Sequence, residues 1–478
     1  MTKNNLLYLI CLLLGQGLCG WAQNGYQIKG NIHGFGGQTL TLAHYFGADQ
    51  YITKSIAKAD TSGLFVFKGD EALPQGLYML LKSNKQRTAD FVIGKEQIFS
   101  FSSDSSDIIN KMKIEGSPDS KLFYQYQQQV LGISNEIAFL QVQQKFRQDM
   151  ISQAKINTLR KQIGDNYQRF VKENEKTLTG KLMAAGGEVL LPTPPKRTDG
   201  RPDSTWLFNY YRTHFWDNFD FSDERLVRTP TLQRKLDRFM QQLTFPQPDS
   251  LIQAADGIIE KALKGNSKEL IAYCIWYLTN QAENPSVMGI EAAFVHLAEK
   301  YYIGGIMPIT DSSTVEGIRA KVNTLKPLLV GKMMPALSVT DTMGKLRTLE
   351  SIKAKYTVLV FYDPNCSHCK EATPVLKAFY DKNKKAIDVQ VFAVSITSSP
   401  DDWKKYIQTY GVGEWIHGYD YSFRTDFRKQ FDVINAPMIY VLDANKKIIA
   451  RRLPADQLDG FMDYFESQLA LEKAEKLK

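Results

Sequence analysis

The sequence predicts a multidomain chain with an N-terminal antiparallel β-sandwich or barrel, a central all-α module and a C-terminal α/β module. Two patterns predict this order. Short alternating apolar runs give way to apolar residues at helical spacing, and strand and helix signals then alternate to the end of the chain. A third observation is length, because 478 residues are too many for a single hydrophobic core.

Residues 1–22 have the pattern of a signal peptide. Lys3 gives a positive start, and the apolar run LLYLICLLLG has the length of a signal-peptide core and is too short to span a bilayer. Ala22 is the small residue before the predicted cut. A lipoprotein signal with Cys19 as the lipidated residue is the less favoured alternative, because Leu18 is large for the position before such a cysteine. We expect export to the periplasm or cell envelope.

The β-rich module is predicted at residues 23–117. Runs such as YQIKGNI, TLTLAHYF and GLFVFKGD alternate in polarity and are separated by Gly, Asp, Ser and Pro. This spacing is typical of a small antiparallel sandwich. No acid pair, histidine cluster or phosphate-binding loop stands out in it.

The helical module is predicted at residues 118–329. It opens with the cap-like sequence Ser-Pro-Asp and continues with amphipathic patterns. A proline-rich, polar stretch at 191–204 predicts an exposed loop. The segment TWLFNYYRTHFWDNFDF is dense in aromatic residues, which we interpret as a packed helical core rather than a ligand or peptide groove.

The C-terminal module is predicted at residues 330–478. YTVLVFYD and DVQVFAVSI predict buried strands, each followed by a helical pattern, and MIYVLD and KIIARRL predict a strand pair. A long charged helix ends the chain. A βαβ unit followed by a strand pair and a helix makes a compact α/β sheet domain.

Charge and hydropathy argue against a nucleic-acid partner and against a transmembrane segment. The net charge of +8 is mild for this length, and basic residues are interleaved with acidic ones, so the sequence gives no support to a nucleic-acid role. After the first residues no stretch approaches the roughly 18 apolar residues of a membrane span. We therefore expect no transmembrane segment in the mature chain.

The chain has five cysteines, of which signal cleavage would remove two and leave Cys274, Cys366 and Cys369. This number is too low for a disulfide-stapled scaffold. Cys274 lies in the apolar helical pattern ELIAYCIWYLTN and is predicted to be a small buried hydrophobe. Cys366 and Cys369 form the motif CSHC, which in an exported protein favours a reactive pair.

The local order around Cys366 suits a nucleophile. A buried strand runs into a turn at Asp363-Pro364-Asn365, and a helix is predicted to start at or next to Cys366. Free N–H groups at a helix N-terminus stabilise a thiolate, which is the form that attacks disulfides. Cys369 follows one helical turn later, within disulfide reach, and is the predicted resolving thiol. His368 can stabilise the thiolate further and shift the pair towards oxidising behaviour.

Metal binding is the competing use of a Cys-x-x-Cys motif. A structural zinc site needs four ligands, usually with a second close cysteine pair, and the sequence has no such pair. A metal-binding chaperone that uses the CSHC motif remains an alternative. We expect no metal and no cofactor in the favoured interpretation.

The motifs of the C-terminal module resemble the thioredoxin superfamily. The resemblance rests on the strand–Cys-x-x-Cys–helix unit, on Pro374 five residues after the second cysteine, and on INAPMIYVLDANKKIIA. It implies a cis-proline at Pro437, where Ala436 and Pro437 shape the surface that holds the partner chain. The leader GKMMPALSVTDTMGKLRTL is similar to the N-terminal hairpin of the TlpA/ResA-like branch, exported thiol–disulfide oxidoreductases related to peroxiredoxins (AhpC/TSA). The preceding residues resemble β-rich and helical modules of unknown function.

The chain departs from that family at three positions. Asn365 stands where thioredoxins usually have Trp, and Val360 where they have a buried acid. Ala372 occupies the place of the glutamate of TlpA/ResA-like reductases. Glu371, one residue earlier, either serves instead or is a solvated acid of the first turn. The direction and potential of the exchange are therefore left open, although we favour the reductive direction.

The resemblance implies a thiol–disulfide oxidoreductase. Its partners would be disulfide- or thiol-bearing envelope proteins and a membrane-borne redox protein that completes the cycle. A different class of function also fits the sequence: an envelope binding or scaffold protein, in which the front modules bind partners and the thioredoxin domain is accessory.

Overall fold

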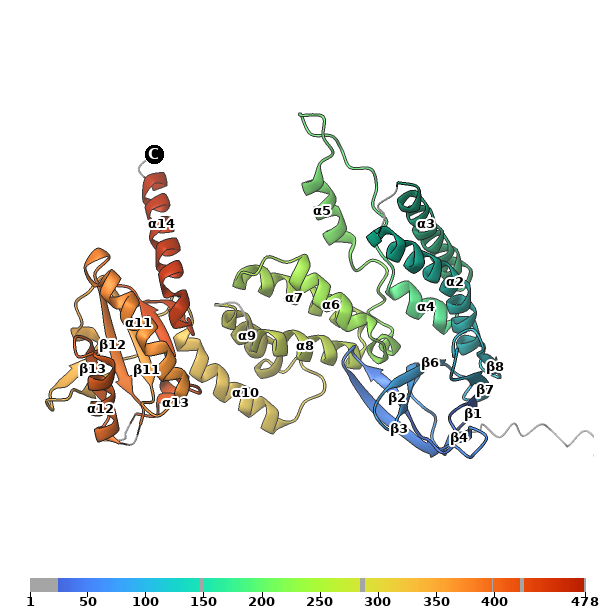
Figure 1. Ribbon diagram of the computed structural model, residues 1–478, viewed down its shortest axis with the longest axis horizontal. Coiled ribbons are helices and arrows are strands. Elements are labelled where there is room, and N and C mark those ends of the chain that lie inside the picture. The colour runs from blue at the N-terminus through green and yellow to red at the C-terminus, as the bar shows by residue number, and fades with distance from the viewer. Residues whose placement is uncertain (1–24, 147–149, 284–288, 398, 422–424, 477–478) are drawn as a thin grey trace, which may run out of the picture. The chain divides into compact units, whose positions relative to one another are not determined.

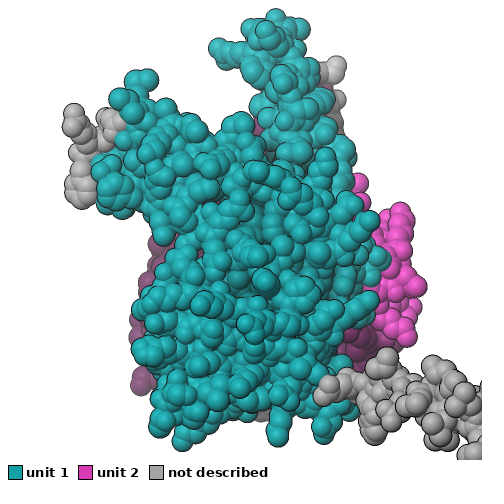
Figure 2. Space-filling view, turned by 90° about the vertical axis from the view of Figure 1, so that its right-hand side faces the viewer, with its two compact units in different colours: residues 1–239 teal, residues 240–478 magenta. Residues whose placement is uncertain are grey.

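The computed structural model of the protein (Figure 1) describes five stretches of the chain: residues 25–146, 150–283, 289–397, 399–421 and 425–476. They divide into two compact units, residues 1–239 and 240–478 (Figure 2). This division falls within the predicted helical module, and the predicted module boundaries remain predictions. The predicted signal peptide and Cys19 lie outside the described residues. Among the described helices, none has the length and apolar character needed to cross a membrane.

The first unit begins with eight strands in two four-stranded sheets. One sheet has the order β4 (Leu64–Gly69), β1 (Tyr26–His33), β7 (Ile98–Asp104) and β8 (Lys113–Glu115). The other has the order β3 (Gln50–Lys58), β2 (Thr39–Phe46), β5 (Gly76–Lys82) and β6 (Arg87–Ile93). Alternate side chains of β1, such as Ile28 and Ile32, share a core with residues of the second sheet. The predicted sandwich is confirmed, although the pair β1–β7 is parallel.

Helices follow the sandwich. The long helices α2 (Pro118–Phe146) and α3 (Met150–Glu173) lie side by side (Figure 1) and share an apolar cluster. The shorter elements are α4 (Leu178–Ala185), α5 (Ser204–His214), the 3₁₀ turn η1 (Glu224–Arg228) and α6 (Thr231–Gln242). The loop predicted at 191–204 is almost wholly exposed, and it ends one residue early because the Asp203 side chain caps α5 by accepting from the Trp206 N–H.

The aromatic segment that begins with α5 only partly forms the predicted packed core. Phe215, Trp216 and Phe219 are buried and in ring contact, as predicted. None of the residues of α5 itself is buried, and Trp206 stacks on Tyr210 at an exposed site. The prediction of a core is therefore wrong for α5, because aromatic density alone does not reveal which helical turns meet a neighbouring element.

The second unit opens with further helices. They are α7 (Pro248–Gly265), α8 (Lys268–Glu283), α9 (Glu291–Leu297), the π-helical turn η2 (Ala298–Ile303), α10 (Ser312–Leu325) and the 3₁₀ turn η3 (Lys326–Leu328). Helix α8 is apolar nearly all round and is buried accordingly. Cys274 on α8 is fully buried, as predicted.

A seven-stranded sheet forms the C-terminal domain. Its order is β10 (Leu346–Thr348), β9 (Ser338–Thr340), β13 (Ile416–Tyr419), β12 (Val389–Ser395), β11 (Tyr356–Tyr362), β14 (Met438–Leu442) and β15 (Ile448–Arg451). Strand β11 runs parallel to β12 and antiparallel to β14. All residues of β11 are buried, which explains its continuous apolar run.

Helices cover both faces of this sheet (Figure 1): α11 (Ser367–Ala386), α12 (Pro400–Tyr410), α13 (Phe427–Phe431) and α14 (Leu458–Lys476). Alternate residues of β11 belong to different cores. Val358 and Val360 pack with α11 and α14, whereas Leu359 and Phe361 pack with Phe431 of α13. The fold class predicted from the sequence, β-rich then α then α/β, is confirmed.

Candidate active site

The two cysteines lie at the junction of β11 and α11. After the strand, Asp363 accepts hydrogen bonds from two following backbone N–H groups: its carboxylate from Asn365 at 2.9 Å and its carbonyl from Cys366 at 3.1 Å. These bonds close the turn and place Cys366 at the N-cap of α11 with extended backbone angles. The helix therefore starts where the sequence predicts.

The two sulfurs differ in exposure. Both cysteines are free; Cys366 is half-buried and Cys369 fully buried. The Cys366 Sγ lies 3.5 Å from the carbonyl oxygen of Ala436, and the bond from Ala436 to Pro437 is cis, as the resemblance implies. The backbone N–H of Asp363 donates to the Cys369 Sγ at 3.4 Å. Accordingly, Cys366 is the accessible thiol and Cys369 lies behind it.

Burial raises the pKa of Cys369 to about 12, although the hydrogen bond from the Asp363 N–H acts in the opposite direction. The small cavity beside its sulfur is lined by Val360, Tyr362, Pro437, Ile439 and other described residues, and none of these is acidic. Val360 thus places no carboxylate in the cavity beside the Cys369 thiol, and the nearest acid that acts on its pKa is Asp363, which raises it.

Two hydroxyl groups that the sequence analysis missed form hydrogen bonds with the backbone carbonyl of Cys369. Tyr406 of α12 and Thr373 of α11 each donate to the carbonyl oxygen of Cys369 at 2.9 Å, and their hydroxyls lie 2.5 Å apart. Thr373 follows Cys369 by four residues, a spacing at which such a bond is common in helices. No sequence signal points to Tyr406.

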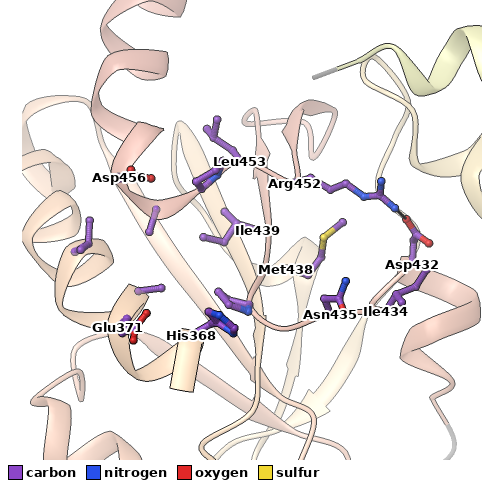
Figure 3. A pocket seen from close by; sticks show the side chains of 15 residues that line it. His368, Glu371, Asp432, Ile434, Asn435, Met438, Ile439, Arg452, Leu453 and Asp456 are labelled. Atoms are coloured by element: carbon purple, nitrogen blue, oxygen red, sulfur yellow. Dashed lines mark hydrogen bonds and ion pairs between the residues drawn. The ribbon is translucent and has the colours of Figure 1, made fainter. Parts of the chain in front are cut away.

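His368 and Glu371 project from the first turns of α11 and are both exposed. They line a groove of about 830 Å³ that runs past Pro437 (Figure 3). Pro374 is also exposed and, lacking an N–H, leaves the Lys370 carbonyl without its usual helical partner. Asn365 is exposed as well, and its side-chain amide donates to Asp402 of α12 at 3.3 Å.

The far wall of the groove comes from residues that the sequence analysis did not single out. Met438 and Leu453 contribute apolar surface, and Arg452 contributes a charge (Figure 3). The Arg452 guanidinium donates to Asp432 at 2.7 Å. The groove lies beside the cysteine pair. Of the predicted site residues, His368, Glu371 and Pro437 line it, whereas Cys366, Cys369, Asn365, Pro374 and Ala436 are not among its lining residues.

A metal site is not evident in the described part of the chain, where no group of three or more His, Cys, Asp and Glu side chains is arranged to hold an ion. His368 and Cys366 share the first turn of α11, but no third ligand accompanies them among the described residues.

Comparison with known families assigns all three parts of the chain. Residues 354–448 match the family model described as thioredoxin-like. Residues 172–324 and 26–123 match two domains of unknown function, DUF5106 and DUF4369. DUF5106 therefore corresponds to the helical part of the structure, and DUF4369 to the β-rich part.

The chain is 24% identical over 144 residues to the thiol-disulfide oxidoreductase ResA of Bacillus thuringiensis, covering 28% of this chain and 76% of that protein. It is 40% identical to the solved domain of a "possible thiol-disulfide isomerase" from Cytophaga hutchinsonii, covering 30% of this chain and 98% of that one, with a TM-score of 0.29. A solved thioredoxin-like protein from Bacteroides caccae is 18% identical, covers 58% of this chain and 99% of its own, and has a TM-score of 0.47. The chain belongs, through its C-terminal domain, to the thioredoxin-like family of thiol–disulfide oxidoreductases.

Proposed function

We propose that the protein exchanges disulfides with envelope proteins through Cys366 and Cys369, in the reductive direction. One observation carries this proposal: a half-exposed sulfur at a helix N-cap lies against the Ala436 carbonyl, next to Pro437, with a buried second sulfur behind it. The first thiol is open to a partner disulfide, and the second is protected from it.

The exchange has two steps. The Cys366 thiolate attacks one sulfur of the substrate disulfide, which forms a mixed disulfide and releases the other substrate sulfur as a thiolate. Cys369 then loses its proton and attacks the Cys366 sulfur, which forms the Cys366–Cys369 disulfide and releases the reduced substrate. Two electrons thus pass from the cysteine pair to the substrate. A membrane-borne dithiol protein would return two electrons and two protons.

The burial of Cys369 supports this order of steps. A thiol with a pKa of about 12 stays protonated while Cys366 attacks. When the mixed disulfide forms, the Asp363 N–H already points at the Cys369 sulfur and stabilises the thiolate that resolves it. Export of the protein, on which the envelope clients depend, is proposed from the signal-peptide pattern of residues 1–22.

Trapping of the mixed disulfide tests the proposal. The full-length Cys369→Ser protein, produced in the envelope, should accumulate covalent complexes that disappear on reduction, whereas Cys366→Ser should form none. Cys274→Ser serves as a control because its sulfur is fully buried in α8. Equal trapping by the Cys366 and Cys369 variants would contradict the assigned roles.

The reduction potential of the couple tests the direction. A value near the roughly −270 mV of thioredoxin would support the reductive direction, and one near the roughly −120 mV of DsbA would contradict it.

A further inference from the structure

A buried chain of charges connects helix α9 with the wall of the substrate groove. The Glu291 carboxylate of α9 lies 3.6 Å from the Arg451 Nε at the end of β15. The Arg451 Nη2 donates to Asp432 at 2.8 Å, and Asp432 also accepts from Arg452 at 2.7 Å. Arg452 lines the groove next to Leu453 (Figure 3). Glu291 of the helical module is thus three ion pairs away from Arg452, a residue that a substrate would touch.

Three of the four members of this chain are enclosed by protein, whereas Arg452, on the groove side, is exposed. Glu291 is 2% exposed, Arg451 1% and Asp432 5%. Two carboxylates face two guanidinium groups, so the cluster is balanced in charge. A charged group that is buried away from water is stabilised by its oppositely charged partner, and removal of one partner leaves an uncompensated buried charge. The geometry of the cluster is therefore fixed more firmly than that of a surface ion pair.

The C-terminal end of the helical module adds two further contacts. The Leu328 carbonyl accepts from the Arg451 Nη1 at 3.5 Å, and the Leu328 side chain is buried in the apolar core that contains Phe431. Helix α10 contacts α13, the helix that ends at Phe431 immediately before Asp432. Two residues of the helical module, Glu291 and Leu328, therefore interact with Arg451. Helix α13, which directly precedes Asp432, also contacts the module through α10.

The backbone on the groove side is held in an unusual conformation. Asp432 and Arg452 have positive φ angles of 50° and 52°, although neither is a glycine. Such conformations persist where the surroundings impose them. The ion pair between these two residues ties both backbones together, and the segment that begins at Asp432 leads through Ile434 and Asn435 into Pro437. The position of this loop thus depends on the cluster behind it.

We infer that Glu291 is a positioning residue through which the helical module sets the shape of the groove for polypeptide substrates. The inference rests on the proposed function, since it concerns substrates of the same cysteine pair. A polypeptide whose disulfide meets the Cys366 sulfur beside Ala436 would extend along the groove, past Pro437, Met438 and Arg452. A small disulfide can reach the half-exposed Cys366 sulfur without the groove. Glu291 therefore acts on the recognition of protein substrates and not on the thiol chemistry.

A single substitution in the full chain tests this. Glu291→Gln keeps the shape of the side chain and removes its charge, while Arg451 keeps Asp432 as a partner. We expect kcat/KM for a disulfide-bonded protein, insulin, to fall about three- to thirtyfold through a higher KM, as for other mutations that act through a packed network. The rate with a small aromatic disulfide and the reduction potential of the couple should stay unchanged.

Glu283→Gln is the matched control. Glu283 is also an acid of the helical module and pairs with Lys321, but this pair is part-exposed and both residues belong to the helices α8 and α10. Glu283→Gln should leave the rates with insulin and with the small aromatic disulfide unchanged. An unchanged ratio of the two substrate rates in Glu291→Gln, with the wild-type protein active, would overturn the inference. Absence of any activity in the wild-type protein would instead contradict the proposed function.

Hydrogen exchange gives a readout that does not need turnover. Amides of residues 432–438 should exchange faster in Glu291→Gln than in the wild type and in Glu283→Gln, and equal exchange would overturn the inference. The double variant with Glu291→Gln and Arg451→Met removes both charges, and with them the excess positive charge that Glu291→Gln alone leaves in the cluster. It should unfold at a higher urea concentration than Glu291→Gln yet keep the poor insulin KM. A wild-type KM in the double variant would mean that only stability was affected.

Discussion

The Sγ atom of Cys366 lies 3.5 Å from the backbone carbonyl oxygen of Ala436. This contact joins the start of α11 to the loop that precedes β14, two segments 70 residues apart in the chain. It leaves the Cys366 sulfur half-exposed, whereas Cys369, one turn further along the helix, is fully buried. The two thiols of the pair should therefore differ strongly in reactivity.

Alkylation of the reduced protein tests this difference. At about pH 7.5 iodoacetamide should modify Cys366 and spare Cys369 and Cys274, because the thiolate is the reactive form and burial raises the pKa of both spared thiols to about 12. Mass spectrometry of the three cysteine peptides measures the outcome. In urea all three should react, and comparable modification of Cys366 and Cys369 in the folded protein would contradict the prediction.

The hydroxyl of Tyr406 should stabilise α11 through its bond to the Cys369 carbonyl. We expect Tyr406→Phe to lower the free energy of opening of α11 by about 1 kcal/mol, the usual contribution of one hydrogen bond. Native-state hydrogen exchange of the α11 amides measures this quantity. Tyr410→Phe is the control, because Tyr410 packs on the Tyr406 ring but makes no hydrogen bond to the described residues through its hydroxyl. Equal effects of the two substitutions would show that ring packing, not the hydroxyl, matters.

The part of the site that is determined by neighbouring residues in the sequence, from the end of β11 to the start of α11, could be predicted. A β-branched strand, a turn at Asp363 and a cap at Cys366 are encoded within a few residues, so the predicted helix start at Cys366 agrees with the structure, whereas the role of Cys366 as nucleophile stays a prediction. The same local rules apply to α12, where the Ser399 side chain caps the helix by accepting from the Asp402 N–H. The cis bond before Pro437 came from resemblance, since no local pattern specifies it.

The remaining parts of the site depend on contacts between distant segments. Tyr406 reaches Cys369 from another helix, and Asp432 meets Arg452 across the strand pair that separates them. Glu291 meets Arg451 from a different module. Single residues of these kinds are common on any surface helix, and only the fold brings them together. The exposure of the aromatic residues of α5 could not be predicted for the same reason, because the burial of a residue depends on the neighbouring element and not on composition.

His368 is predicted to adjust the potential of the cysteine pair. It is exposed in the first turn of α11, next to Cys369, where we expect its imidazole to favour the thiolate form of the reduced pair. His368→Ala should therefore make the potential more negative, by about 10–30 mV for a solvated group. Equilibration of the full-length protein with glutathione measures the change. Ser367→Ala, another exposed position of the same turn, should have no effect, and an unchanged or less negative potential in His368→Ala would contradict the prediction.

Asp90 of β6 should make the stability of the β-sandwich depend on pH. Burial raises its pKa to about 6, although Arg87 lies 3.0 Å from its carboxylate and Tyr45 donates a hydrogen bond at 3.3 Å. The folded state thus holds a proton on Asp90 at pH values where the unfolded chain, with a pKa near 3.8, has released it.

Because the unfolded chain binds fewer protons than the folded one between these two pKa values, the free energy of unfolding should fall as the pH rises from about 4 to about 7, by about 3 kcal/mol from Asp90 alone. Asp90→Asn removes this titration and should raise the midpoint of the calorimetric transition of the sandwich more at pH 7 than at pH 4. Asp60→Asn, at an exposed turn of the same sandwich, is the control. Hydrogen bonds from Ser62 and Leu64 lower the pKa of Asp60, so its stabilising contribution is already largely present above the unfolded value of 3.8, and Asp60→Asn should lower the midpoint by a similar amount at pH 4 and pH 7. An Asp90→Asn protein whose midpoint shifts equally at both pH values would show that the Asp90 carboxyl titrates as it does in the unfolded chain.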